Sequence, residues 1–202
     1  SEKPAAERLA GFYCMMFADQ ALSRFLDYPW HACLDIGAGA GVHSNIMRKH
    51  GRTTVTIDSG HDADIREDYL RVDVSESYKA IWCSHTLEHQ VNPGLFLTKM
   101  FGDLQDGGVL AVTVPPAKHQ IVGGHVTLWN AGLLLYQLIL AGFDCSAARV
   151  GVYGYNISVI VQKRRALLPE LRHDAGDIET LAHLFPVPVQ QGFDGQLGNI
   201  NW

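Results

Sequence analysis

Three glycines alternate along the segment GAGAG, at Gly37, Gly39 and Gly41, directly after the short apolar run ACLDI. Glycine lets a backbone turn sharply and lets a ligand approach without a clash with Cβ. Open α/β sheets bind ligands at such strand-to-helix turns. A dinucleotide fingerprint of the GxGxxG type would need its last glycine at position 42, where the chain has Val42. The turn indicates a ligand site, with a purely structural tight turn as the alternative.

Two aspartates stand where a nucleoside would need hydrogen-bond acceptors. Asp58 ends the run TTVTID, roughly 20 residues beyond the glycine turn, and an acid there can accept hydrogen bonds from ribose hydroxyls. Asp73, in the segment RVDV, could accept one from an adenine amino group. Each acid alone is also typical of an ordinary strand end or turn. The prediction of a nucleoside site therefore depends on the combination.

Histidines are abundant, with ten in the chain. His85 follows the run KAIWCS and is the first candidate for a general base. His125 lies with His119 in the segment KHQIVGGHVTLW and is the second candidate. The alternative for each of them is a hydrogen-bonded loop histidine.

The segment HTLEH places His85 and His89 at positions i and i+4, which share one face of a helix, with Glu88 beside them. Imidazole and carboxylate are both metal ligands. The zinc-protease pattern HExxH needs Glu directly after the first His, however, and this chain has Thr86 there. From the sequence we therefore predict no metal at this segment.

The elements that must position these side chains alternate between strand and helix. Strands are predicted over 32–36, 53–58, 69–74, 79–85 and 109–115, and helices over 41–50, 92–104 and 129–141. Two further strands, 146–154 and 156–164, are separated by a short turn only, which predicts a hairpin. This order predicts an α/β fold, Rossmann-like and doubly wound, with a mostly parallel seven-stranded sheet and an antiparallel C-terminal hairpin strand.

Both ends of the chain lie outside this alternation. Apolar residues recur at three- and four-residue steps over 4–27, which predicts a helix and an N-terminal helical cap over 1–30. The cofactor-binding domain is then expected over 31–164. Residues 165–202 form a C-terminal appendage with one helix over 177–185, packed on the core or on the second subunit of a homodimer.

Composition narrows the class of protein. The 202 residues suit one domain, and 47% hydrophobic with 18% charged residues is typical of a soluble globular protein. A net charge of −5 offers no attraction to nucleic acid or to an anionic membrane, so neither partner is expected. The four cysteines form no CxxC pair, and we expect reduced thiols in a cytoplasmic protein.

Four motifs follow one another over about 31–164: CLDIGAGAG, TVTID, RVDV and the block IWCSHTLEHQVNPGLFLTKMFGDLQDGGVLAVTVPP. Their order resembles that of the class I S-adenosylmethionine-dependent methyltransferases, and most closely the small-molecule branch. The block over 81–116 is the most specific part, because LEH, a helix, DGG and a strand follow at the family's spacing. The resemblance implies transfer of a methyl group from S-adenosyl-L-methionine to an O, N or C atom of a small-molecule acceptor.

The same resemblance implies a role for each polar residue of the motifs. Asp35 and the glycine turn would line the methionine end of the cofactor, Asp58 would take the ribose hydroxyls, and Asp73 would contact adenine. The cofactor-binding residues implied are Asp35, Gly37, Ala38, Gly39, Asp58, Ser59, Asp73, Val74 and Ser84. His85 and His125 are the candidate catalytic residues, on the acceptor side.

Other functions stay open at this point. A catalytically inactive nucleotide-binding or regulatory protein of the same fold is one. An NAD-dependent oxidoreductase is another, although Val42 counts against it. A nucleic-acid methyltransferase that acts on amino groups would place Asn or Asp, two prolines and an aromatic residue after the fourth strand, where this chain reads SHTL.

Overall fold

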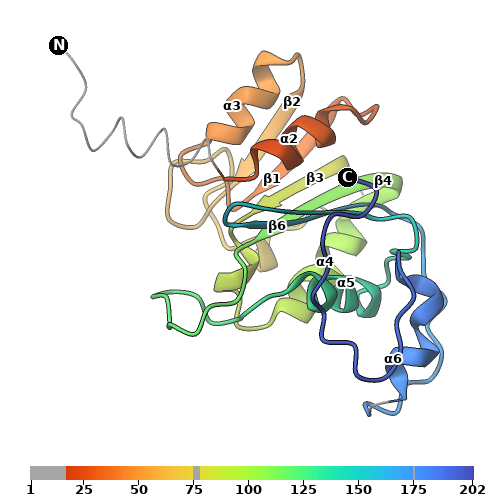
Figure 1. Ribbon diagram of the computed structural model, residues 1–202. Helices are drawn as coiled ribbons and strands as arrows, with labels where there is room; N and C mark the ends of the chain where they lie inside the picture. The colour runs from red at the N-terminus through yellow and green to blue at the C-terminus, as the bar shows by residue number, and fades with distance from the viewer. Residues whose placement is uncertain (1–16, 75–77, 175) are drawn as a thin grey trace.

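The computed structural model describes residues 17–74, 78–174 and 176–202 (Figure 1). Most of the predicted N-terminal helix over 4–27 lies outside the described residues. The part inside them forms α2 (Asp19–Leu26). Among the described helices, none combines the length and the apolar character that a bilayer span requires.

A mixed sheet forms the centre of the molecule. In the described residues it has six strands in the order β2-β1-β3-β4-β6-β5. The strands are β1 (Ala32–Ile36), β2 (Thr53–Ile57), β3 (Tyr78–Ser84), β4 (Leu104–Val114), β5 (Arg149–Tyr153) and β6 (Asn156–Gln162). The first four are parallel, whereas β6 runs antiparallel to β4 and pairs with β5 as a hairpin. The predicted Rossmann-like α/β fold with an antiparallel C-terminal hairpin is confirmed.

The predicted strand over 69–74 is wrong, so the sheet has six described strands instead of seven. Tyr69–Arg71 is a single 3-10 turn, η1, in which the Asp68 carboxylate accepts a hydrogen bond from the Leu70 N–H at 3.0 Å. The buried Tyr69 hydroxyl donates to Asp103 Oδ2 at 2.7 Å. This contact joins Tyr69 to the last residue of the helix Pro93–Asp103. The segment therefore packs against that helix and does not extend the sheet.

Helices cover both faces of the sheet (Figure 1). On one face lie α2 and α3 (Val42–Lys49), and on the other lie α4 (Pro93–Asp103) and α5 (Ala131–Leu140). Side chains alternate across a strand. In β3, Trp82 therefore packs with α2, whereas Ile81 and Cys83 pack in the opposite cluster. Burial on both faces explains why the central strands are almost continuously apolar.

Local capping fixes where two of these helices begin. The Asn92 side chain accepts from the Leu95 N–H at 3.1 Å ahead of α4, and Pro93 occupies the first turn. Asn130 accepts from the Leu133 N–H at 2.8 Å ahead of α5. The Asn130 cap thereby fixes the end of the loop between β4 and α5, and this loop projects beside the sheet (Figure 1).

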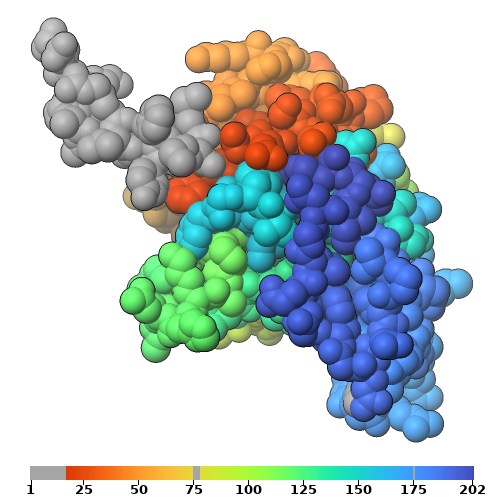
Figure 2. Space-filling model, viewed as in Figure 1, coloured from red at the N-terminus to blue at the C-terminus, as the bar shows by residue number. Residues whose placement is uncertain are grey.

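The C-terminal residues return to the edge of the sheet. After α6 (Asp177–Thr180) and η3 (Ala182–Leu184), the chain runs back so that Val150 and Ile200 exchange two backbone hydrogen bonds of 2.9 Å. The Trp202 ring covers Gly151 and stacks on Tyr153, with ring centroids 5.7 Å apart. Figure 2 shows this segment, in dark blue, running up to α2, in red. The tail thereby covers the edge strand β5.

Candidate active site

The glycine turn lies at the carboxyl end of β1, next to the end of β2. Gly37 and Gly39 have φ values of 71° and 54°, in the left-handed region that favours glycine. The Gly37 N–H donates to the Ile57 carbonyl at 2.8 Å. A Cβ at Gly37 would overlap the Thr86 side chain, which follows β3. Both the backbone angle and the close approach of a third strand end therefore require glycine at position 37.

The Asp58 carboxylate, at the end of β2, is held by backbone N–H groups from two loops. Oδ2 accepts from Gly39 at 2.8 Å, and Oδ1 accepts from Gly60 at 2.8 Å and from His61 at 2.9 Å. Burial by itself raises the pKa of Asp58, but these hydrogen bonds outweigh it and lower the pKa below its ordinary value. Asp58 is therefore an ionised acceptor in a fixed orientation.

Asp35, for which the resemblance implies a place at the methionine end of the cofactor, belongs to β1. It is buried behind the turn, and its Oδ2 accepts a hydrogen bond from the Ser44 hydroxyl of α3 at 2.6 Å. Burial raises the pKa of Asp35 to about 6, although the Ser44 hydrogen bond and the charge of Arg48 oppose the shift. Asp35 thus connects β1 to α3 and supports the turn from behind.

A cavity of about 390 Å³ opens in front of the turn, at the carboxyl ends of β1 and β2. This volume lies within the usual range of small-molecule sites. The described residues that line it are Ile36, Gly37, Gly39, Ile57, Asp58, Ser59, Gly60, His61, Glu67, Asp68, Tyr69, His85, Thr86, His89, Gln90 and Phe96.

Several residues singled out in the sequence meet at this cavity, and others do not. Gly37, Gly39, Asp58, Ser59 and His85 all line it. Ala38 lines a separate hollow on the other side of the turn. The described residues around the cavity do not include Asp35, Asp73, Val74 or Ser84.

The cavity also includes residues that no sequence pattern predicts. They come from the segment before η1, represented by Glu67 and Asp68, and from the segment after β3, represented by Thr86 and Gln90. Glu67 and Asp68 lie in a polar loop segment, where acidic residues are common and carry no specific signal. Thr86 and Gln90 flank the LEH motif, and no local pattern marks either residue as a ligand contact.

Ser84 is the last residue of β3, beside Thr86. Within the described part of the chain, its buried hydroxyl has no hydrogen-bond partner. A buried hydroxyl without a partner is costly, and a polar ligand group is one way to satisfy it. With the glycine turn and Asp58, this orphaned hydroxyl fits a cofactor that carries an amino-acid end and a ribose.

His85 has φ of 53°, in the left-handed region, and both of its ring nitrogens face oxygen atoms that accept. Nε2 lies 3.0 Å from Asn156 Oδ1, which also accepts from the Ala18 N–H. Nδ1 lies 3.3 Å from Glu88 Oε1. The imidazolium can donate to both oxygens, whereas neutral His85 can donate to one. A general-base role would therefore require one of the two contacts to open.

His125 and His119 belong to the loop after β4, and they differ in environment. His119 is exposed. His125 is partly buried, and its ring meets the ring of His89 edge-on, with centroids 5.0 Å apart. His125 thus approaches the same wall as His85, from the other side of Glu88.

The sheet carries the glycine turn and the Asp58 carboxylate at the carboxyl ends of its parallel strands, which is where open α/β sheets bind ligands. A family model described as a methyltransferase domain matches residues 12–164. The chain therefore belongs to the methyltransferase family. It is an S-adenosylmethionine-dependent methyltransferase, and the cofactor and the enzyme class expected from the sequence are confirmed.

Solved structures share the fold at low sequence identity. A SAM-dependent methyltransferase from Archaeoglobus fulgidus is 14% identical, with a TM-score of 0.58 over 72% of this chain and 93% of that one. The 1,6-didemethyltoxoflavin-N1-methyltransferase of Burkholderia thailandensis, bound to 1,6-didemethyltoxoflavin and S-adenosylhomocysteine, is 14% identical, with a TM-score of 0.61 over 81% and 92%.

A third structure, the [4+2]-cyclase SpnF, is 20% identical, with a TM-score of 0.52 over 63% of this chain and 58% of that one. The fold alone thus does not decide the reaction. A sequence search of curated proteins gives no match.

Proposed function

We propose that the enzyme transfers the methyl group of S-adenosylmethionine to a small-molecule acceptor and binds the cofactor in the cavity at the carboxyl ends of β1, β2 and β3. The observation that carries this proposal is the fixed, ionised Asp58 carboxylate facing the same cavity as Gly37 and Gly39. A ribose presents two hydroxyl donors, and a carboxylate held by backbone N–H groups keeps lone pairs in a fixed direction for them.

The roles of the remaining cofactor residues are proposed from the resemblance and from their positions in or beside the cavity wall. The backbone of Gly37, Ala38 and Gly39 would hold the methionine end, and the orphaned Ser84 hydroxyl would meet its amino group. Ser59 would join Asp58 at the ribose.

On the adenine side, Asp73 and the backbone of Val74 follow η1, which itself lies at the cavity wall. Asp35 would act from behind, through Ser44, by holding the turn against α3. It is a positioning residue in this account.

When bound, S-adenosylmethionine supplies a methyl group on a sulfonium that is already a good leaving group. The protein then has to align the acceptor and exclude water. His85 keeps the wall beside Glu88 in place, and His125 approaches from the loop after β4. A proton from a hydroxyl acceptor would pass to His85 Nε2 only after its contact with Asn156 opens.

The net charge and one structural neighbour favour a small acceptor over a macromolecule. The chain carries a net charge of −5, which offers no general attraction to a nucleic-acid backbone. The Burkholderia thailandensis structure, of which this chain covers 92%, has 1,6-didemethyltoxoflavin bound.

The test uses S-adenosylmethionine labelled in its methyl group. The protein is incubated with pools of small hydroxyl, amine, thiol and carboxylate compounds, and separately with RNA and with DNA. The proposal expects label in a small-molecule fraction. Label in nucleic acid would contradict the acceptor class, and binding of NAD in place of S-adenosylhomocysteine would contradict the cofactor site.

A further inference from the structure

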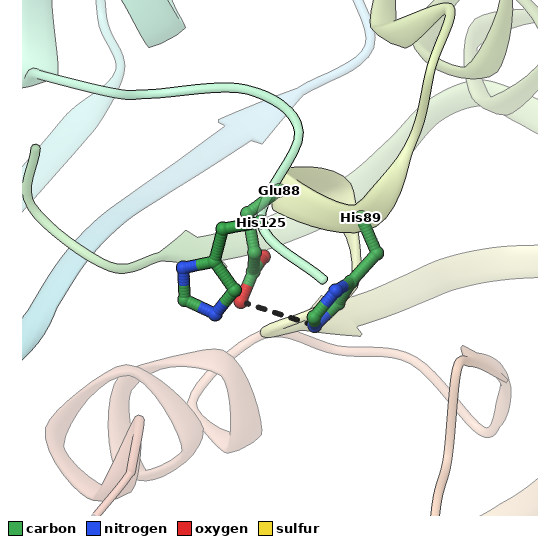
Figure 3. A group of neighbouring side chains, drawn as sticks. All are labelled: Glu88, His89 and His125. Atoms are coloured by element: carbon green, nitrogen blue, oxygen red, sulfur yellow. Dashed lines mark ion pairs between the residues drawn. The ribbon is translucent and has the colours of Figure 1, made fainter. Parts of the chain in front are cut away.

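Glu88, His89 and His125 meet at the junction between η2 (Leu87–His89) and the loop that follows β4 (Figure 3). One ligand atom from each of the three lies within 4.8 Å of the other two. Glu88 and His89 are neighbours in the LEH motif, whereas His125 comes from the loop. The fold therefore supplies a third ligand that the spacing in HTLEH does not indicate.

Backbone hydrogen bonds hold the loop against η2. The Glu88 carbonyl accepts from the Val126 N–H at 2.9 Å and from the Thr127 N–H at 3.2 Å. The Trp129 indole N–H donates to the Thr127 hydroxyl at 3.0 Å, and Trp129 is buried. These contacts directly follow His125 in the chain, so the main chain holds this part of the loop next to Glu88.

The His89 ring has its tautomer set by the same loop. Nδ1 lies 2.6 Å from the Gly124 carbonyl oxygen, which can only accept, so Nδ1 carries the proton. Nε2 of neutral His89 is then left with a lone pair, and it lies 3.9 Å from Glu88 Oε1. A ring nitrogen oriented through a backbone carbonyl in this way is typical of metal-ligating histidines.

The buried carboxylate of Glu88 is a separate argument for a metal site. The Glu88 side chain is 1% exposed, and among the described residues its Oε2 has no hydrogen-bond partner. His85 contacts only Oε1, at 3.3 Å. A buried carboxylate is costly unless it is paired or coordinates a metal.

We propose that Glu88, His89 and His125 bind a divalent metal ion of the zinc class. Two imidazoles and one carboxylate suit Zn²⁺ and neighbouring transition metals, and three protein ligands leave a coordination position open. Tetrahedral coordination with bonds of about 2.1 Å separates ligand atoms by about 3.4 Å. The three ligand atoms lie within 4.8 Å of one another, with 3.9 Å between His89 Nε2 and Glu88 Oε1, so the side chains would close on the ion as it binds.

The ion would lie at the boundary of the proposed cofactor cavity. His89 lines that cavity, whereas His125 lines a small hollow on the far side with Lys118 and Tyr155. The open position is therefore available to an oxygen or nitrogen atom of an acceptor. This statement about the acceptor rests on the proposed function, but binding of the ion does not.

The test is a titration of metal-free protein, without a histidine tag, with Co²⁺ followed by visible absorption and with Zn²⁺ followed by calorimetry. We expect one equivalent to bind with the d–d bands of a four- or five-coordinate site. Glu88→Gln, His89→Ala and His125→Ala should each weaken binding at least tenfold. His50→Ala and His183→Ala, which remove exposed histidines elsewhere, should not change it.

Thermal melts identify any variant that fails to fold. Of the three substitutions, His125→Ala should disturb folding least, because His125 is only partly buried and lies in a loop. Wild-type protein that binds no stoichiometric metal, or ligand variants that bind as wild type does, would overturn the site. A preference for Mg²⁺ over Co²⁺ and Zn²⁺ would overturn the class of metal. Binding of S-adenosylhomocysteine, measured on the same wild-type sample, reports separately on the proposed function.

Discussion

The two sides of the cavity are built in different ways. On the side of β1 and β2, the groups that face the ligand are the backbone of Gly37 and Gly39 and one carboxylate, Asp58, held by backbone N–H groups. On the side of β3, they are side chains, with His85 and His89 arranged around the buried Glu88.

The two constructions differ in how easily a substitution can change the chemistry of each side. A backbone-built wall depends on φ angles and close approach, so it tolerates almost no change at its glycines. A wall of side chains depends on partners that come from distant segments, so its chemistry can change with one substitution. We therefore assign the common cofactor to the first side and the particular acceptor to the second.

The largest effect is expected from Gly37→Ala. The new Cβ would overlap Thr86, and φ of 71° is strained for alanine. Strain and overpacking together should cost about 4 kcal/mol of unfolding free energy and abolish tight binding of S-adenosylhomocysteine. Denaturant unfolding and calorimetry measure the two effects.

The matched control for this substitution is Gly51→Ala. Gly51 has φ of 75°, but within the described residues a Cβ there meets nothing within 4 Å. It therefore carries the strain without the overlap. Equal losses in the two variants would contradict the account of the turn.

The pH dependence of the unfolding free energy of Asp35→Asn tests whether the buried Asp35 carboxyl supports the glycine turn. Because burial raises the pKa of Asp35 to about 6, the folded state holds this proton between pH 3.8 and about 6, where the unfolded state has lost it. Wild-type stability therefore falls as pH rises through this window, by about 3 kcal/mol from this group.

The asparagine variant lacks this titration. Its unfolding free energy relative to wild type should therefore rise between pH 4 and pH 6 and stay level above that. A difference that does not vary with pH would mean that Asp35 has an ordinary pKa in the folded protein.

Trp202→Ala tests a region remote from both sides. The ring covers Gly151 and stacks on Tyr153, and its Nε1 donates to Gln20 Oε1 at 3.2 Å. Its loss should cost about 2 kcal/mol of stability and leave the affinity for S-adenosylhomocysteine within twofold. A large loss of affinity with intact folding would connect the tail to the site.

The smallest effect is expected on the histidine side. His85→Ala should lower kcat about tenfold while cofactor affinity stays the same, because His85 holds Glu88 and does not touch the Asp58 wall. His85→Gln, which keeps a donor, should restore part of the rate if His85 is a positioning residue. If both variants instead remove the same limb of the pH–rate profile, His85 is a general base.

The sequence predicts the backbone-built side well and the other side poorly, for a physical reason. Glycines that need positive φ, and an acid at a strand end, are local signals, so the turn and Asp58 could be placed from the chain alone. The Tyr69–Asp103 hydrogen bond joins segments far apart in sequence, and this contact is why 69–74 is not a strand. The approach of His125 to Glu88 is also a tertiary contact, so the HTLEH spacing alone led to the prediction of no metal at this segment.

The most direct measurement is calorimetric titration of S-adenosylhomocysteine into wild type, Asp58→Asn and Asp62→Asn. Asp62 lies in the same loop, but its side chain is exposed, which makes it a matched removal of charge. The account predicts at least a tenfold loss of affinity for Asp58→Asn and less than a twofold change for Asp62→Asn. Wild-type affinity in a folded Asp58→Asn variant would contradict it.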